Sequence, residues 1–201
     1  MQPDFASVFP LRVGRVHECC GLGSAAFAAM VAASGQGGAL WIRPEQRQKE
    51  ALYPVGITSV FEPSRMLMAQ TKTEVDSLAV AEEALRDGAL SCVLIDITRP
   101  LDLREGRRLQ LAARAGGTTG LCLIPEGMGS NAAETRWRVR PLFDPESEVS
   151  TLMRWEIIKN KAGILGVWNV RWSDEARRVQ VVPPEDARSG SQGQHTQGPR
   201  G

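Results

Sequence analysis

A glycine-rich turn before an alanine-rich segment is the first place where this 201-residue chain could bind a ligand. Residues 19–27 read CCGLGSAAF, and the backbone amides of Gly21, Gly23 and Ser24 could hold a phosphate at the start of a helix. A nucleotide-binding loop also needs a lysine and a magnesium-binding hydroxyl, but alanine and phenylalanine stand in their places. No lysine precedes Lys49. The sequence therefore favours a tight turn over a phosphate site.

Two acidic residues follow apolar runs, where a parallel sheet presents its ligand-binding edge. Asp96 closes the run LSCVLI and could hold Mg²⁺ through water. A helix cap or a loop salt bridge is an equal alternative for this carboxylate. Glu45 follows ALWIRP and could activate a water molecule, but the helix dipole also favours a glutamate in a first turn. We prefer the second interpretation for Glu45.

Basic and aromatic residues alternate in the segment TRWRVRPL. Arg136, Arg138 and Arg140 share one face and could contact DNA phosphates or a partner, although a solvated strand face is slightly favoured. Trp137 lies on the other face and is a candidate for core packing or for a partner surface. The basic helix expected at 103–115 has the same two interpretations as the arginine row.

The cysteines and histidines do not form a metal motif. The four cysteines include no CxxC, and the two histidines lie far apart at His17 and His195. Cys92 and Cys122 lie inside apolar runs. We expect reduced, buried thiols in a cytoplasmic protein and no metal site.

Short apolar segments alternate with helical patterns through the first two thirds of the chain. We expect strands at 14–20, 39–42, 90–97 and 119–124, a further apolar run at 66–69, and helices at 24–34, 44–52 (Pro44 in its first turn), 73–87 and 103–115. In the helix 73–87, Val75 is expected on the same apolar face as Leu85. Apolar strands that alternate with helices predict an α/β fold with a mainly parallel sheet flanked by helices.

The hydrophobic period changes to two after residue 130. Strands are expected at 135–142, 154–159, 166–172 and 177–182, and they indicate a C-terminal antiparallel meander at the edge of the sheet. Residues 1–10 are expected to form an N-terminal extension, 11–182 one domain, and the Pro/Gly/Ser/Gln-rich residues 183–201 a disordered tail.

Charge and composition exclude some classes of protein. The chain has 24 basic and 23 acidic residues, so bulk charge does not drive nucleic-acid binding. Residues 97–182 carry 14 basic and 10 acidic side chains, against 8 and 11 in residues 1–96. There is no apolar run of transmembrane length and no visible signal peptide, so we expect a cytoplasmic protein without a membrane partner.

The order of these segments resembles the RecA family over residues 11–182. GRVHECCG with its alanine-rich helix, TEVDSLAVAEEALRDGALSCVLIDI with Asp96 in the acidic position, and TRWRVRPL followed by RWEIIKNKAG carry the resemblance. It implies a RecA-like core, with Glu45 at the position of the catalytic glutamate. It also implies that Lys159 and Lys161 of the KNK segment lie near a neighbouring subunit's nucleotide.

More specifically, the sequence resembles the ImuA family of SOS mutagenesis cassettes. The segments LDLREGRRLQLAARAGGTTGLCL and NAAETRWRVRPL carry this closer resemblance. It implies a role in the SOS response to DNA damage, in translesion synthesis and mutagenesis. The implied partners are RecA and an ImuB-like homologue of the Y-family polymerases, with indirect contact to an error-prone C-family polymerase and DNA.

The sequence departs from the RecA pattern at groups that RecA uses for catalysis. The loop lysine is missing, and Pro125-Glu126 stands where RecA keeps a phosphate-sensing glutamine. The segment that replaces the second DNA-binding loop is also short. We therefore expect a non-catalytic adaptor that needs no cofactor, with a degenerate nucleotide site made by Gly21, Gly23, Ser24, Glu45 and Asp96. The alternatives are a weak ATPase that binds ATP, Mg²⁺ and DNA, or a regulator that resembles SOS cell-division inhibitors.

Overall fold

The computed structural model describes residues 3–45, 54–144 and 151–183. Nine strands form one sheet: β1 Val16–Cys20, β2 Ala39–Pro44, β3 Met66–Thr71, β4 Cys92–Asp96, β5 Thr119–Leu123, β6 Thr135–Pro141, β7 Met153–Asn160, β8 Gly166–Ser173 and β9 Arg178–Val182. Four α-helices accompany them in the described residues: α1 Ser24–Ala33, α2 Pro54–Ile57, α3 Glu74–Asp87 and α4 Leu103–Gly116. Short 3-10 turns lie at Phe5–Ser7 and Pro63–Arg65.

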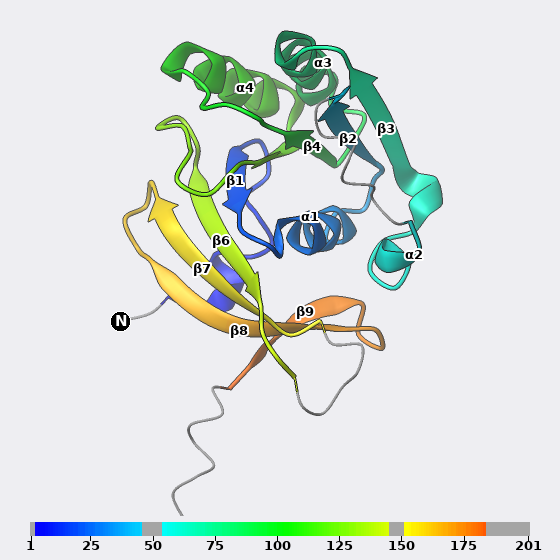
Figure 1. Ribbon diagram of the computed structural model, residues 1–201, viewed down its shortest axis with the longest axis vertical. Coiled ribbons are helices and arrows are strands. Elements are labelled where there is room, and N and C mark those ends of the chain that lie inside the picture. Colours follow the sequence, from blue (N-terminus) through cyan, green and yellow to red (C-terminus); the bar gives the residue numbers. More distant parts are fainter. Residues whose placement is uncertain (1–2, 46–53, 145–150, 184–201) are drawn as a thin grey trace, which may run out of the picture.

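The sheet has a parallel part and an antiparallel part. Its strand order is β3-β2-β4-β5-β1-β6-β7-β8-β9, and all neighbours from β3 to β6 pair in parallel. From β6 to β9 each pair is antiparallel, and these strands curve away from the parallel part (Figure 1). The prediction of a mainly parallel sheet with a C-terminal meander is confirmed.

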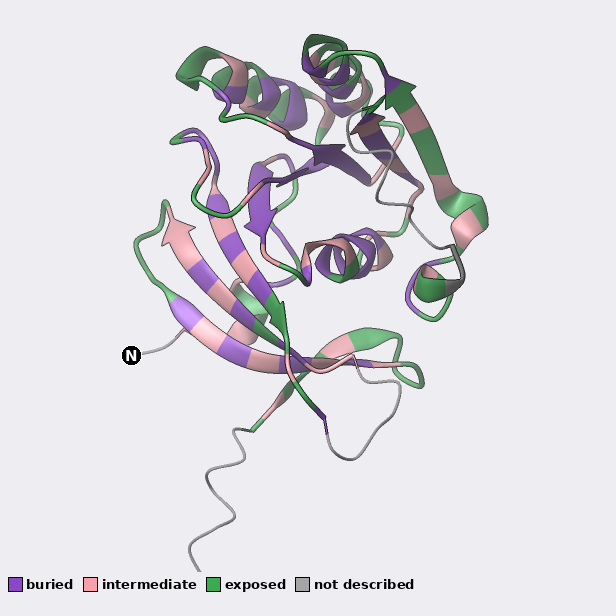
Figure 2. Ribbon diagram, viewed as in Figure 1, coloured by how far each residue is buried: buried purple, intermediate pink, exposed green. Residues whose placement is uncertain are grey.

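The central parallel strands β1, β4 and β5 are buried on both faces, and their side chains alternate between two cores. On one face α1 and the inner side of the meander enclose the first core, which includes Phe27, Trp41 and Trp137. On the other face α3 and α4 cover the second core, with Leu85 and Leu109 at its centre. Figure 2 shows the buried central strands beside α3 and α4, whose outer surfaces are exposed. This sandwich explains why the central strands read as continuous apolar runs.

Local signals set the helix ends. Thr73 and Asp76 form a capping box that begins α3, and Asp102 and Glu105 form another that begins α4. Helix α1 begins without a side-chain cap, and it differs from α3 and α4 in its burial. Phe27 to Ala32 are all buried, because the helix is enclosed on several sides. Its alanines let the helix pack close to the sheet.

Several expectations about the elements need correction. Val75 is 68% exposed because the buried stripe of α3 runs through Ser77, Ala81 and Leu85 instead. Pro44 is the last residue of β2 rather than part of a helical first turn. The remainder of the helix expected at 44–52 lies outside the described residues, apart from Glu45, and so does the tail from residue 184.

The segment before residue 11 packs against the domain. The Phe5 ring lies 5.6 Å from Trp168, and the Phe9 ring lies 5.1 Å from Trp155, measured between ring centroids. Phe9 is 7% exposed. The residues expected to form an N-terminal extension therefore complete the first core.

Candidate functional site

The turn between β1 and α1 is closed by β6. Gly23 donates its backbone N–H to the carbonyl of Val139 over 3.1 Å, and Ser24 donates its own to the carbonyl of Gly21 over 3.1 Å. Gly21 has φ +98°, and a Cβ there would lie 2.3 Å from the Val139 carbonyl oxygen. A Cβ at Gly23 would lie 2.5 Å from Cγ1 of Val139. The glycines are therefore required for the close approach of strand β6.

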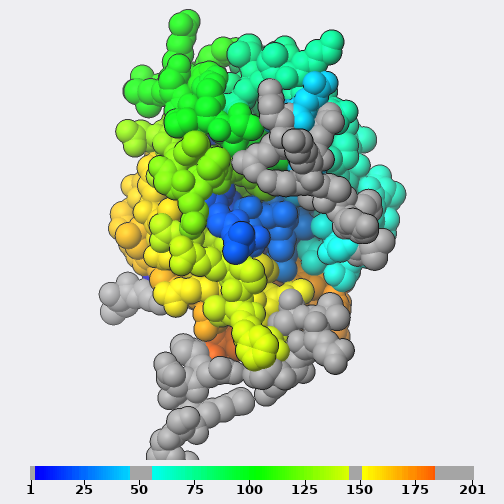
Figure 3. All heavy atoms as spheres, in the orientation of Figure 1, coloured from blue at the N-terminus to red at the C-terminus, as the bar shows by residue number. Residues whose placement is uncertain are grey.

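This geometry does not fit a nucleotide. Two of the amides that could hold phosphate are already donated within the protein, and the sequence provides no lysine in this turn. Leu22, at the tip of the turn, is 91% exposed and adds an apolar side chain. In Figure 3 the blue surface of this part of the chain lies directly against the yellow-green surface of the β6 region. The structure therefore agrees with the tight turn that the sequence favours.

Asp96 forms a buried ion pair at the end of β4. Its Oδ2 accepts a hydrogen bond from Nε of Arg43 on β2 over 2.8 Å, and its Oδ1 accepts one from Nε1 of Trp41 over 3.2 Å. The carboxylate is 5% exposed and joins two neighbouring parallel strands. Both oxygens are engaged, so the salt-bridge interpretation of Asp96 describes the structure better than a magnesium ligand. Glu45 is exposed immediately after β2.

The arginine row on β6 is matched by carboxylates. Arg136 donates from Nε to Oε2 of the buried Glu18 over 2.7 Å. Arg138 pairs with Glu126 and Glu156 over 3.4 Å each, and Arg140 pairs with Glu126 over 3.2 Å. The row is therefore a strand face with internal ion pairs rather than an array of uncompensated cations.

Glu18 is a structural residue that sequence reasoning missed. It is 2% exposed, and its Oε1 accepts the backbone N–H of Ser130 over 2.7 Å while Oε2 accepts from Arg136. The carboxylate thereby fixes the connection between β5 and β6. The signal was an acidic residue within the strand expected at 14–20. A carboxylate buried in such a strand requires partners.

The two lysines of the KNK segment hold the same connection. Nζ of Lys159 donates to the carbonyls of Ser130, Asn131 and Ala133, and Nζ of Lys161 donates to the carbonyl of Ala132. Partial burial lowers the pKa of the Lys159 amine. Within the described residues, both amines therefore act on the chain's own backbone. The contact with a neighbouring subunit stays a prediction.

Trp137 is not available for contact with DNA or a partner. Its side chain is 0% exposed, it packs 5.5 Å from the Phe27 ring, and its indole N–H donates to the Thr135 hydroxyl over 2.8 Å. The expectation that it contacts a partner is corrected, because the face of β6 opposite the arginines turns into the first core.

Metal and membrane features are lacking in the described part of the chain. Cys19, Cys20, Cys92 and Cys122 are free and buried, and burial raises the pKa of Cys92 to about 12. Among the described residues, no three metal-ligating side chains gather around one point. The helices seen in residues 3–45, 54–144 and 151–183 are too short or too polar to cross a bilayer.

Two comparisons with known proteins agree with this architecture, whereas no family model matches the sequence. The chain is 28% identical over 167 residues to proteins named ImuA from two strains of Caulobacter vibrioides. The alignment covers 70% of this chain and 66% of each relative, so the chain spans about two thirds of their length.

A solved structure gives independent information on the fold. The chain is similar to the crystal structure of the RadB recombinase with a TM-score of 0.63 and 13% sequence identity. The match covers 86% of this chain and 92% of that one. At this identity the likeness concerns the fold, and it confirms the RecA-like architecture expected from the sequence. The sequence similarity to the proteins named ImuA and the structural similarity to RadB together support an ImuA-like, RecA-like assignment for this chain.

Proposed function

We propose that this protein is a non-catalytic RecA-like accessory factor in SOS-induced translesion synthesis and mutagenesis. In this role it is an adaptor between RecA and an ImuB-like homologue of the Y-family polymerases, and through them it acts with an error-prone C-family polymerase on DNA. Its similarity to proteins named ImuA and its RecA-like fold support the pathway.

The closed turn between β1 and α1 carries the non-catalytic part of the proposal. Where a RecA-like ATPase would hold phosphate, the Gly23 amide is bonded to Val139 and Gly21 lies against the same residue. Opening this turn would require β6 to move away from the turn. The ion pair of Asp96 with Arg43 supports the same interpretation, because magnesium binding would compete with it.

A nucleotide assay tests the absence of catalysis. We expect a fluorescent ATP analogue with Mg²⁺ to bind the full chain more weakly than about 1 mM, which corresponds to about 4 kcal/mol. ATP turnover should equal the buffer blank. Turnover clearly above the blank that disappears in Asp96→Asn would overturn the non-catalytic proposal and favour a weak ATPase.

A bridging assay tests the adaptor role. RecA filaments are assembled on immobilised single-stranded DNA, and the polymerase homologue is added with and without this chain. We expect the filaments to retain more of the homologue when the chain is present. Equal retention in both cases would refute the adaptor role, whatever the result of the nucleotide assay.

A further inference from the structure

One side of α4 presents both apolar and basic side chains to solvent. Leu103 is 49% exposed and Leu111 is 67% exposed, and Arg107 and Arg114 lie on the same side of the helix. The spacing of four, four and three residues aligns these side chains in one stripe. The opposite side of α4 packs into the second core through Leu109 and Ala113, so the stripe lies outside that core.

The stripe faces a groove whose second wall is the connection between β5 and β6. Leu103, Leu111 and Ala132 line a hollow of about 330 Å³, and a neighbouring hollow of about 230 Å³ shares Leu111 and Lys161. Figure 1 shows this connection beside α4.

The groove is formed by a fixed framework. Nε2 of Gln110 on α4 donates to the carbonyls of Val16 and Ala132 over 2.7 and 3.0 Å. A Cβ at Gly106 would lie 2.5 Å from Oγ of Ser130, so the helix and the connection pack closely below the groove. Nζ of Lys161 donates to the same Ala132 carbonyl over 2.7 Å. The groove therefore exists before any partner binds.

The groove is strongly basic although the whole chain is nearly neutral. Four cationic side chains line the two hollows against a single carboxylate, Glu134. Glu134 already pairs with Arg12 and Arg15. Arg107 and Arg114 form no ion pair with any residue that the structure describes.

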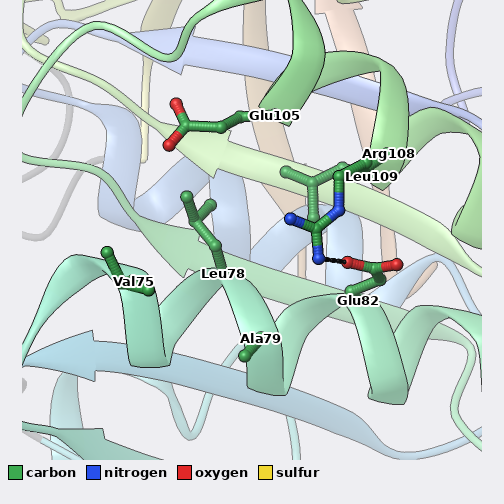
Figure 4. A pocket seen from close by; sticks show the side chains of 7 residues that line it. All are labelled: Val75, Leu78, Ala79, Glu82, Glu105, Arg108 and Leu109. Carbon is green, nitrogen blue, oxygen red and sulfur yellow. Dashed lines mark hydrogen bonds and ion pairs between the residues drawn. The ribbon is translucent and has the colours of Figure 1, made fainter.

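The other groove along α4 has the opposite character. It lies between α3 and α4, and its charged groups are paired. Arg108 pairs with Glu82 (Figure 4), and Glu105 pairs with Arg99. Its volume is about 100 Å³. Among the α4 cations that line these two grooves, the two without an ion pair, Arg107 and Arg114, therefore lie on the side that also exposes the two leucines.

We propose that the groove between α4 and the connection 124–134 binds an acidic segment of a partner protein that carries large apolar side chains. The apolar side chains would cover Leu103 and Leu111, and the carboxylates would pair with Arg107 and Arg114. A DNA backbone would match the arginines but would leave the leucines in water, so a peptide fits better. This inference does not depend on RecA or a polymerase homologue being the partner.

Selection from random peptides tests the proposal, because it requires no assumption about the sequence of the partner. A display library of peptides of about 16 residues, long enough for four helical turns, is selected on the immobilised full chain. Enriched peptides are then labelled with fluorescein for anisotropy. We expect acidic residues interspersed with Leu or Phe.

Matched substitutions locate the binding site. Arg107→Glu should weaken binding by about tenfold or more, whereas Arg104→Glu, on the same helix but outside the groove, should change it by less than about twofold. Leu111→Asp should weaken binding, and Val75→Asp, equally exposed in the other groove, should not. Near-UV circular dichroism checks that each variant is folded.

Three results would overturn the proposal. The first is that no peptide is enriched over a chain-free surface. The second is that enriched peptides bind Arg107→Glu and Leu111→Asp as tightly as the unchanged chain. The third is that a fluorescein-labelled single-stranded oligonucleotide, but no acidic peptide, loses affinity in Arg107→Glu, which would assign the groove to DNA.

Discussion

The buried carboxylate of Glu18 makes Arg136 different from the other arginines of its row. Glu18 is 2% exposed, and the guanidinium of Arg136 is its cationic partner at 2.7 Å. Arg136→Ala would leave that charge buried without compensation and should lower the free energy of unfolding by about 3 kcal/mol. Urea unfolding followed by tryptophan fluorescence measures the change.

Arg140 supplies the matched control. Its side chain is 58% exposed and its partner Glu126 is 50% exposed, so Arg140→Ala should cost less than about 1 kcal/mol. Equal losses in the two variants would contradict the structural role assigned to Arg136.

His17 should make the protein less stable in mild acid. Burial lowers the pKa of His17 from 6.5 to about 4. Its Nε2–H donates to the carbonyl of Arg12, and Nδ1 accepts from the Thr135 hydroxyl, which itself accepts from the Trp137 indole. These partners satisfy a neutral imidazole with its proton on Nε2, and burial disfavours the charged form.

The sign of the effect follows from the two states. Below pH 6.5 the unfolded chain takes up a proton at this histidine, whereas the folded chain does so only near pH 4. The contribution of a neutral His17 to the free energy of unfolding is therefore fully present above about pH 6.5 and is lost as the pH falls towards 4. Between pH 7 and pH 5 the free energy of unfolding should drop by about 2 kcal/mol. His17→Gln should flatten this slope, and an unchanged slope would exclude His17 as its source.

The sequence predicted the strand face that each side chain of β6 occupies, but it did not predict the partners of those side chains. The alternation in TRWRVRPL placed Arg136, Arg138 and Arg140 on one face and Trp137 on the other, as in the structure. It could not identify Glu18 as the partner of Arg136, because 118 residues separate them and only the pairing of β1 with β6 brings them together.

At the scale of elements, the turn between β1 and α1 depends on glycine. In Gly21→Ala the new Cβ would lie 2.3 Å from the Val139 carbonyl oxygen, at a backbone φ of +98°. We expect a loss of about 2 kcal/mol or more in the free energy of unfolding by urea. Gly56→Ala, where no atom lies within 4 Å, should be nearly neutral. A neutral Gly21→Ala would mean that β6 does not close this turn.

The N-terminal segment should contribute to stability as a core element does. Phe9 is 7% exposed and its ring meets those of Phe27 and Trp155. Phe9→Ala should cost about 3 kcal/mol in urea unfolding, because it empties part of an aromatic core. Phe143→Ala removes the same ring from a site that is 89% exposed and should change stability by less than about 0.5 kcal/mol. If the two variants behaved alike, the segment would not be part of the core.

Elements with strong local signals were predictable, and those set by tertiary contacts were not. The helices at 73–87 and 103–115 carry capping boxes and following glycines, and both are present as α3 and α4. The burial of Glu74 in place of Val75 depends on contacts beyond the helix, since Glu74 accepts the backbone N–H of Thr98. The packing of Phe5 and Phe9 likewise depends on tryptophans about 150 residues away along the chain.

At the scale of the whole molecule, the two cores share the strands that lie between them, because each strand sends alternate side chains to opposite faces. In β4, Cys92 and Leu94 belong to the first core, and Val93 and Ile95 belong to the second. β1 and β5 divide their side chains in the same way, with Cys19 and Leu121 on one face and Cys20 and Cys122 on the other. Neither core can lose its strands without exposing the other.

Because the two cores share these strands, we expect both faces of the sheet to unfold together. All five tryptophans lie in the first core, so their fluorescence reports that face. In a Cys19→Ala/Cys92→Ala variant, the remaining thiols Cys20 and Cys122 report the second core. Pulse labelling of these thiols across a urea series should give the same midpoint as fluorescence, as expected of one cooperative unit. Labelling at clearly lower urea would show instead that the second face of the sheet opens as a separate unit before the first.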